Sequence, residues 1–383
     1  MADRVTRNNS LIFGAIVALA CCNIAFGMSI QLIPLVMDHE GDSKTLIGLS
    51  TTLGQTGPMF MGFFLPMLTR RFSTHKLVLI ALTVIILMMI GFATTQPKWS
   101  WFVIRFIVGL SMSVLFTTSE TWIQAATDDK SRARIMGLYI SVMTLSFGVG
   151  PLLIPVTGFL GPWPWLAGMV PLLIGLGFMA TLKVEKVAHE EEAHGFLATA
   201  LKAPLIFICV GATTIFESIM LSFFTLYAIA NGRSLDEAAL LLSFGIAAGL
   251  VFFYPIGWLA DHWSRRGTIW LCVAVAIIGS LAQAPLISTL AIWPLIPVLR
   301  AGAFGTYLNG FAMLGDRFKG AELITAAAIV SVLWGVGGVI GPPLAGFAID
   351  HIGIGILPYA MAICYLPVIA GMMLTGGSAK LAR

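Results

Sequence analysis

Residues 77–95 read LVLIALTVIILMMIGFATT, nineteen positions without one charged side chain. An α-helix needs about 20 apolar residues to cross the hydrocarbon core of a bilayer. Similar runs recur along all 383 residues, of which 58% are hydrophobic and only 10% charged. Soluble domains are roughly 25% charged, and a soluble chain with so little charge could not cover its own surface. The composition therefore predicts a polytopic membrane protein.

Apolar windows of this length predict twelve membrane-spanning helices. The first follows Arg4 and Arg7, but it is too long for the apolar region of a signal peptide, so we expect it to be retained. Runs this long also exclude the alternating pattern of an outer-membrane barrel. The predicted fold class is an all-α membrane protein with two six-helix bundles. The expected spans are residues 11–37, 46–68, 77–95, 101–126, 135–160, 163–182, 203–230, 236–260, 268–287, 290–315, 322–349 and 354–374.

The basic residues predict how the spans are oriented. With both termini in the cytoplasm, 17 lysines and arginines fall in cytoplasmic segments and only 3 (Lys44, Lys98 and Arg233) in outer loops. Such a bias is the positive-inside pattern of membrane proteins. It predicts a multi-pass protein of the cytoplasmic (inner) membrane with both termini cytoplasmic. It also accounts for the net charge of +4, so no nucleic-acid partner is expected.

A charged stretch at residues 183–202 divides the chain nearly in half. It contains several glutamates together with His189 and His194. We interpret it as a solvated cytoplasmic linker, with a metal site as the weaker alternative. The predicted domains are an N-terminal bundle over residues 1–182, this linker, and a C-terminal bundle over residues 203–383.

The two halves repeat one another. Span five ends in GVGP (residues 148–151), and span eleven carries a longer glycine-proline run over residues 337–346. Arg105 precedes Gly109 in span four, and Arg300 stands in a similar place in span ten. An internal duplication around a linker predicts two pseudo-symmetric bundles, which is an architecture of secondary transporters.

Three segments of the chain resemble motifs of the major facilitator superfamily. Residues 257–266 (GWLADHWSRR) resemble its G-x-L-x-D-x-x-G-R-R loop signature, with Ser264 in place of the second glycine. Residues 105–109 resemble its fourth-helix R-x-x-x-G motif, and residues 148–151 part of its fifth-helix motif. The resemblance covers the whole chain, and the segment that begins at Glu120 is similar to a poorly characterised bacterial branch of twelve-helix transporters.

The loop resemblance implies a gate at the cytoplasmic end of span eight. We expect Asp261 to pair with Arg265, Arg266 or a helix end and to hold the inward side shut. In the first half Thr69 occupies the acidic position of the corresponding loop, so that gate residue is missing there.

Four charged residues lie within expected spans and away from the span ends: Arg105, Glu120, Glu217 and Arg300. A charge inside a bilayer is costly unless it faces water or a partner, so these residues are functional candidates. They lie on spans four, seven and ten, which in the family fold line a central cavity together with span one. Arg105 and Glu120 are about 22 Å apart along one helix and cannot pair, at ~1.5 Å per residue.

Glu217 lies near the middle of its span, with no basic residue in the same span. A carboxyl group in a low-dielectric region binds a proton more readily, which is what proton coupling requires. We therefore expect Glu217, and after it Glu120, to couple protons to transport. The alternative for Glu217 is a structural carboxyl group, permanently protonated or paired with an arginine. Glu120 could equally be a gate residue or a loop anchor.

Polar and aromatic residues on the expected cavity helices predict a substrate site of amphipathic character. On span one, Asn23 and Gln31 share a face, and on span ten Arg300 and Tyr307 do so. Trp334 in span eleven is either a cavity wall or a lipid-facing side chain. The predicted substrate-binding residues are Asn23, Gln31, Arg105, Arg300, Tyr307 and Trp334.

These features predict a secondary active transporter that moves a small amphipathic solute by alternating access. A lone carboxyl suits protons better than sodium, and the arginine and glycine-proline motifs resemble those of proton-coupled exporters, so we expect efflux by antiport. Proton-coupled symport of a small organic anion is the alternative, because two cavity arginines suit an anion. A non-transporting sensor or scaffold is a third hypothesis.

Other classes of function are disfavoured. An intramembrane enzyme is not expected, because the chain lacks HExxH and G-x-S-x-G motifs and has no histidine inside a span. The five cysteines lie in apolar runs without ligand spacing, so neither a disulfide framework nor a metal site is predicted. We expect no cofactor. The expected partners are a small-molecule substrate, protons and the lipid bilayer, with the chain acting as a monomer.

Overall fold

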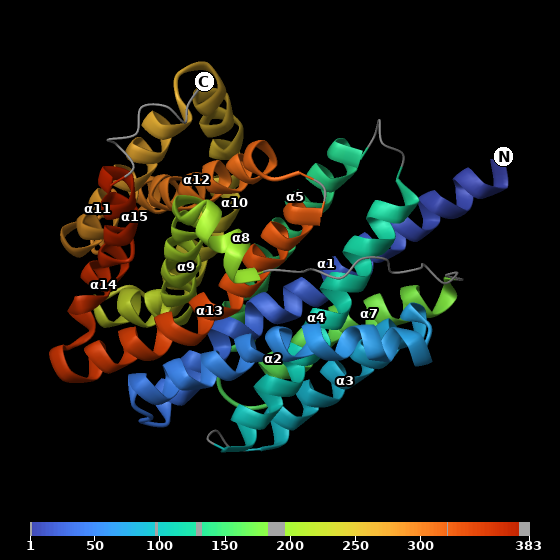
Figure 1. The fold of residues 1–383 in the computed structure, drawn as a ribbon. Coiled ribbons are helices and arrows are strands. Elements are labelled where there is room, and N and C mark those ends of the chain that lie inside the picture. The colour runs from blue at the N-terminus through green and yellow to red at the C-terminus, as the bar shows by residue number, and fades with distance from the viewer. Residues whose placement is uncertain (1, 96–98, 128–131, 183–195, 320, 375–383) are drawn as a thin grey trace. The chain divides into compact units, whose positions relative to one another are not determined.

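The structure is a computed structural model that describes residues 2–95, 99–127, 132–182, 196–319 and 321–374. Within these residues the regular structure is helical, and no strand occurs (Figure 1). The helices are α1 (Ala2–His39), α2 (Lys44–Arg71), α3 (Thr74–Thr94), α4 (Trp99–Ala126), α5 (Arg132–Val149), η1 (Gly150–Leu152), α6 (Leu153–Thr157), α7 (Trp163–Thr181), α8 (Phe196–Lys202), α9 (Pro204–Ala230), α10 (Leu235–His262), α11 (Arg265–Leu286), α12 (Ile292–Arg317), α13 (Ala321–Ile352), η2 (Ile354–Ile356), α14 (Leu357–Ile363) and α15 (Leu366–Leu374).

The all-α membrane fold is confirmed. Ten helical stretches among the described residues are long and apolar enough to cross a membrane. The helices α2 and α12 lie where the second and tenth spans were expected and contain 28 and 26 residues, but they are not among the ten. At ~1.5 Å per residue both exceed the ~30 Å of a hydrocarbon core. The count of twelve spans stays a prediction.

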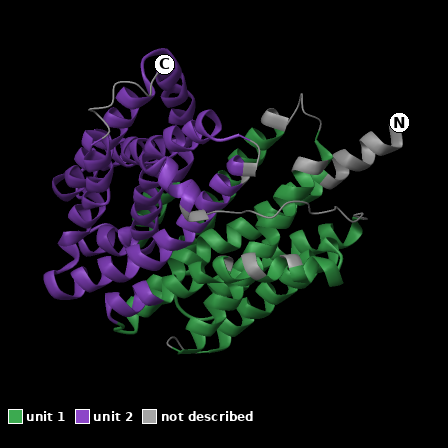
Figure 2. Ribbon diagram, viewed as in Figure 1, with its two compact units in different colours: residues 1–42, 50–190, 235–243 green, residues 43–49, 191–234, 244–383 purple. Residues whose placement is uncertain are grey.

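The chain divides into two compact units, which Figure 2 shows in green and purple. Unit 1 comprises residues 1–42, 50–190 and 235–243, and unit 2 comprises residues 43–49, 191–234 and 244–383. Most of the expected linker, residues 183–195, lies outside the described residues. The alternative of a metal site at its histidines therefore has no structural description. The last seven residues of the linker form α8.

Each unit is organised around one long buried helix. In unit 1, α1 packs against α4, α5 and α7, and α3 packs against α4 and α7. In unit 2, α9 packs against α12, α13 and α15, and α11 packs against α12 and α14. The helix α9 is almost wholly buried by its neighbours, so its polar residues must find partners inside unit 2.

The glycine-proline segment of the fifth expected span interrupts that helix. There α5 ends at Val149 and is followed by the short elements η1 and α6. Gly150 lies against α1, where an added Cβ atom would be 2.4 Å from the carbonyl oxygen of Ile24. No larger residue fits at this crossing. Small residues let membrane helices approach closely in this way, which gives the motif a packing role.

A carboxylate caps the beginning of α2 inside unit 2. Asp350, near the end of α13, accepts hydrogen bonds of 2.8 Å from the backbone N–H groups of Lys44 and Thr45, and one of 2.6 Å from the Thr45 hydroxyl. The two helices touch backbone to backbone, because a Cβ atom at Gly346 would lie 2.2 Å from the carbonyl oxygen of Lys44. The first N–H groups of a helix have no partner within it, and a negative charge there is favourable.

We predict that Asp350→Ala lowers the free energy of unfolding by about 1 kcal/mol, the usual cost of removing a helix N-cap. Asp350→Asn keeps one acceptor oxygen and should cost less. The measurement is denaturant unfolding of the protein in detergent, with Glu40→Ala as the control for loss of an exposed acidic residue. An Asp350→Ala protein as stable as the control variant would contradict this cap.

Candidate functional site

A buried ion pair joins α9 and α12 in unit 2. The Arg300 Nη2 atom lies 2.5 Å from the Glu217 Oε1 atom, and the two side chains are 5% and 4% exposed. The second guanidinium nitrogen, Nη1, lies 3.5 Å from the sulfur of Met220. The other carboxylate oxygen, Glu217 Oε2, is buried and has no hydrogen-bond partner in the described structure. The pair is therefore neutral overall but incompletely satisfied.

Thr213, one turn before Glu217, does not serve the carboxylate. Its hydroxyl donates to the backbone carbonyls of Cys209 and Ala303, and this places α9 against α12. Tyr365, which follows α14 and is fully buried, lies near Glu217. Nothing in the sequence marked Met220 or Tyr365 as neighbours of the pair, because both look like ordinary apolar core residues.

An aromatic cluster continues from the ion pair. The guanidinium carbon of Arg300 lies 5.6 Å from the ring centroid of Phe304. The Phe304 ring contacts the rings of Tyr307 and Trp334, and those two rings are 5.8 Å apart. Phe311 stacks on Tyr307 at 5.9 Å. Because Tyr307 and Trp334 are only half-buried, the cluster leads from the buried charges toward the surface of unit 2.

Four of the residues predicted from sequence therefore come together in unit 2: Glu217, Arg300, Tyr307 and Trp334. Three different helices contribute them, α9, α12 and α13. The arrangement offers apolar ring faces for a solute. It also offers an ion pair that protonation or ligand binding could break. The cation–π contact with Phe304 is favourable and stabilises Arg300 in this position.

In unit 1 the predicted residues Asn23 and Arg105 have different hydrogen-bond partners. Asn23 on α1 donates to the sulfur of Met143 on α5 at 2.9 Å. Gln31 is buried on the same helix. Arg105 on α4 donates to the hydroxyl of Ser50 on α2 at 2.9 Å and lines a small cavity. The side chains that line this cavity do not include Asn23 or Gln31.

Close packing of α2 on α4 positions Arg105. A Cβ atom at Gly109 would lie 2.2 Å from the carbonyl oxygen of Gly54, so the two backbones touch. Arg105 stands one helical turn before this contact, which allows its guanidinium to reach Ser50. Ser50 could not be recognised from the sequence, since serines are common in membrane helices and no spacing pointed to this one.

Glu120, the second predicted proton-coupling residue, lies near the end of α4. Its Oε1 atom accepts a hydrogen bond of 3.3 Å from the hydroxyl of Tyr139 on α5, and the tyrosine is buried. Glu120 itself belongs to the exposed residues of unit 1. This contact joins two helices, which fits the alternative of a structural anchor as well as a proton site.

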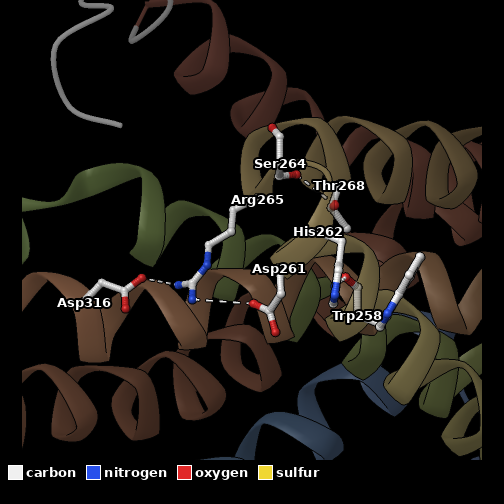
Figure 3. A network of polar contacts seen from close by, with 7 residues as sticks. All are labelled: Trp258, Asp261, His262, Ser264, Arg265, Thr268 and Asp316. Atoms are coloured by element: carbon white, nitrogen blue, oxygen red, sulfur yellow. Dashed lines mark hydrogen bonds and ion pairs between the residues drawn. The ribbon is translucent and has the colours of Figure 1, made fainter. Parts of the chain in front are cut away.

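The expected gate loop forms a network between α10, α11 and α12 (Figure 3). Arg265 lies between two carboxylates: its Nη2 atom is 3.9 Å from Asp261 Oδ1, and its Nη1 atom contacts Asp316 Oδ2. Asp261 and Asp316 are 67% and 63% exposed at their side chains. Arg266 instead donates to the backbone carbonyl of Met372. Asp316 could not be assigned to this loop from the sequence, because it meets Arg265 only in the folded chain.

Ser264 has its own local role in this loop. Its hydroxyl accepts a hydrogen bond of 2.9 Å from the backbone N–H of Gly267, which makes Ser264 the N-cap of α11. A serine in this position therefore begins the next helix, as N-cap residues do. Near it, the rings of Trp258 and His262 stack at 4.6 Å. In the described part of the chain, no three acidic, histidine or cysteine side chains are grouped so that they could hold a metal ion.

Comparisons with known proteins agree with this architecture. A family model described as Major Facilitator Superfamily matches residues 15–310. An uncharacterized MFS-type transporter of Bacillus subtilis (strain 168), YfkF, is 21% identical over 328 residues, which are 84% of each chain. Another, YcaD of Escherichia coli O6:K15:H31, is 22% identical over 341 residues, 87% of each chain.

Solved structures share the fold at low sequence identity. A mutant of the nucleoside transporter NupG has a TM-score of 0.80 at 13% identity, covering 95% of this chain and 99% of that one. A bacterial homolog of the human lysosomal transporter Spinster, inward-facing and unoccupied, has a TM-score of 0.69 at 13% identity, covering 97% and 94%. The family match spans well over half of the sequence, and the chain therefore belongs to the Major Facilitator Superfamily of membrane transporters.

Proposed function

We propose that this protein is a secondary active transporter that exports a small amphipathic solute in exchange for protons, by alternating access. The observation that carries the proposal is the buried Glu217–Arg300 pair beside the aromatic cluster of Phe304, Tyr307 and Trp334. The rings offer an apolar surface for the body of a solute. The ion pair offers a proton site within the same group of helices.

Coupling follows from the cost of burying an unpaired charge. Glu217 is buried in its unit, and a carboxylate there needs either Arg300 or a proton as its partner. A conformation that draws Arg300 away must therefore load Glu217 with a proton, and a conformation that restores the pair must release it. If the two conformations face opposite sides of the membrane, each cycle carries one proton across.

Symport of a small organic anion is the second candidate, and Arg105 favours it. This arginine is 6% exposed and donates to a serine hydroxyl, and within the described residues it forms no ion pair. A third candidate, a sensor derived from a transporter, would bind a solute without moving it. Asn23, Gln31 and Glu120 remain proposed contributors to substrate and proton binding. We place the protein as a monomer in the inner membrane, with both termini cytoplasmic.

The first test is flux through Glu217→Gln. Glutamine keeps the shape of the protonated carboxyl but cannot release a proton, so the variant should lose accumulation driven by a pH gradient and keep exchange at equal concentrations. A thermal-shift screen of cationic, neutral and anionic solutes identifies the substrate. Its flux is then measured in proteoliposomes with and without an imposed pH gradient.

Glu120→Gln is the matched variant, because it removes the other intramembrane carboxyl. Continued pH-driven accumulation in Glu217→Gln would overturn the proton-coupling role of Glu217. Glu120 would then be the carboxyl group to which that role is assigned. A purely structural role for the pair predicts something else: loss of stability in Glu217→Gln with an unchanged ratio of driven flux to exchange.

A second prediction concerns the stability of the ion pair. Arg300→Gln should lower the free energy of unfolding by about 3–5 kcal/mol, because it leaves Glu217 buried and unpaired. Adding Glu217→Gln should restore most of that loss, since the double variant buries no charge. Unfolding in detergent at neutral pH measures both. If the two losses simply add, the residues do not act as a pair.

A third prediction concerns the loop at the end of α10. Arg265→Gln removes both carboxylate contacts and should favour the inward-open state more than Asp261→Asn, because Arg265 in the latter variant keeps Asp316. The readout is labelling of Phe311→Cys from the cytoplasmic side, in a background without the five native cysteines. Exposed ion pairs contribute only ~0–1 kcal/mol, so we expect changes in labelling rate of a few-fold. Equal labelling in all variants would exclude a gate here.

A further inference from the structure

The two buried arginines differ in how their charge is balanced. Arg300 is neutralised by Glu217, whereas Arg105 donates to Ser50, a neutral hydroxyl. Among the described residues no carboxylate forms an ion pair with Arg105. Glu120, on the same helix, is about 22 Å away at ~1.5 Å per residue. A guanidinium withdrawn from water without a counter-charge carries a large desolvation cost. Unit 1 therefore holds an uncompensated buried cation.

A cavity lies beside this cation. It has a volume of about 30 Å³ and lies wholly within unit 1, between α1, α2, α3 and α4. A single water molecule needs roughly 10–15 Å³ of cavity volume, so the space exceeds one water. Apolar side chains form most of the wall, with Phe26 and Phe92 as its aromatic members. Thr51, Gln55 and Arg105 are its hydrogen-bonding members besides Ser29.

The backbone of α2 keeps the space beside the guanidinium open. Gly54 lines the cavity, and a Cβ atom added to it would lie 3.8 Å from the Nε atom of Arg105. That distance is an ordinary van der Waals contact. An alanine would therefore fit at this position without a clash and would occupy space next to the charged group. The glycine thus leaves room where a ligand of Arg105 would lie.

We propose that this cavity binds one small monovalent anion, with Arg105 as its charged ligand. A halide or the carboxylate of a transported solute has the required chemistry: one negative charge, hydrogen-bond acceptor capacity and a size that suits the space. Water would leave the charge unbalanced, and a divalent oxyanion would reverse the net charge. The proposal deepens the proposed function, and rests on it, by assigning an anionic head to the amphipathic solute.

The site does not require Arg300. An anion held by Arg105 is compensated inside unit 1, while the Glu217–Arg300 pair of unit 2 stays free to exchange protons. The apolar wall of Phe26 and Phe92 suits the atoms next to a carboxylate better than a strongly polar solute. In this proposal the two sites have separate roles. Arg105 selects an anionic ligand, and Glu217 binds and releases the proton.

The test is thermal unfolding of the purified protein in detergent, at constant pH. Sodium chloride or sodium benzoate replaces sodium isethionate, whose sulfonate is larger, at constant ionic strength. Benzyl alcohol is the neutral analogue of benzoate. The variants are Arg105→Gln, Arg105→Lys and, as the matched control for loss of an exposed arginine, Arg317→Gln. If a substitution of Arg105 prevents folding, Gly54→Ala still tests the site, because it leaves Arg105 in place.

Chloride or benzoate should raise the Tm of the native protein and of Arg317→Gln in a saturable way, and benzyl alcohol should not. Arg105→Gln should lose the shift, and Arg105→Lys should weaken binding about tenfold because lysine lacks the planar fork of arginine. Gly54→Ala should also weaken binding, by filling the cavity. No shift with either anion, a full shift in Arg105→Gln, or unchanged affinity in Gly54→Ala would overturn the proposal.

Two further measurements separate the sources of the anion. Uptake of labelled benzoate into proteoliposomes, inhibited by chloride, identifies the ligand as a transported carboxylate. Chloride binding without benzoate binding or flux identifies a resident counter-ion at the same site. Because these binding assays use no pH gradient, they succeed or fail independently of Glu217, so a failure of proton coupling is distinguishable from a failure of this site.

Discussion

The absence of water from the hydrocarbon core of a bilayer is the constraint on which this structure depends. Each charge that the chain carries into its spans must be balanced by another group of the protein or by a ligand. Arg105 and Arg300 are 6% and 5% exposed, yet their charges are balanced in different ways. Arg300 has a carboxylate partner, and Arg105 has a hydroxyl and a cavity. The chemical difference between the two halves of the protein follows from this asymmetry.

Glycines decide where these charged groups can lie, because helices in a membrane gain contact by approaching closely. Gly109 brings α4 onto α2 at Gly54, and one turn earlier Arg105 meets Ser50. Gly150 brings the end of α5 onto α1 in a similar way. The spacing of the R-x-x-x-G motif is thus explained by geometry: the glycine makes the crossing, and the arginine uses the proximity that the crossing creates.

Burial also distinguishes the proposed coupling site from the proposed gate. The Glu217–Arg300 pair is shielded from water, so breaking it carries a large energetic cost. The Asp261–Arg265–Asp316 network is exposed and correspondingly weak. A weak contact that forms and breaks easily suits the proposed gate. A strong buried pair suits the proposed proton site.

The sequence by itself determined the membrane fold, the family and the identity of the charged residues inside spans, because hydropathy and charge act locally along the chain. It could not determine which of those charges are paired. Glu217 and Arg300 are 83 residues apart, and Arg105 and Ser50 are 55 apart. Only the packing of α9 on α12 and of α2 on α4 brings these atoms together. The tertiary structure decided that one arginine is neutralised and the other is not, since pairing depends on distances across helices, which no local pattern encodes.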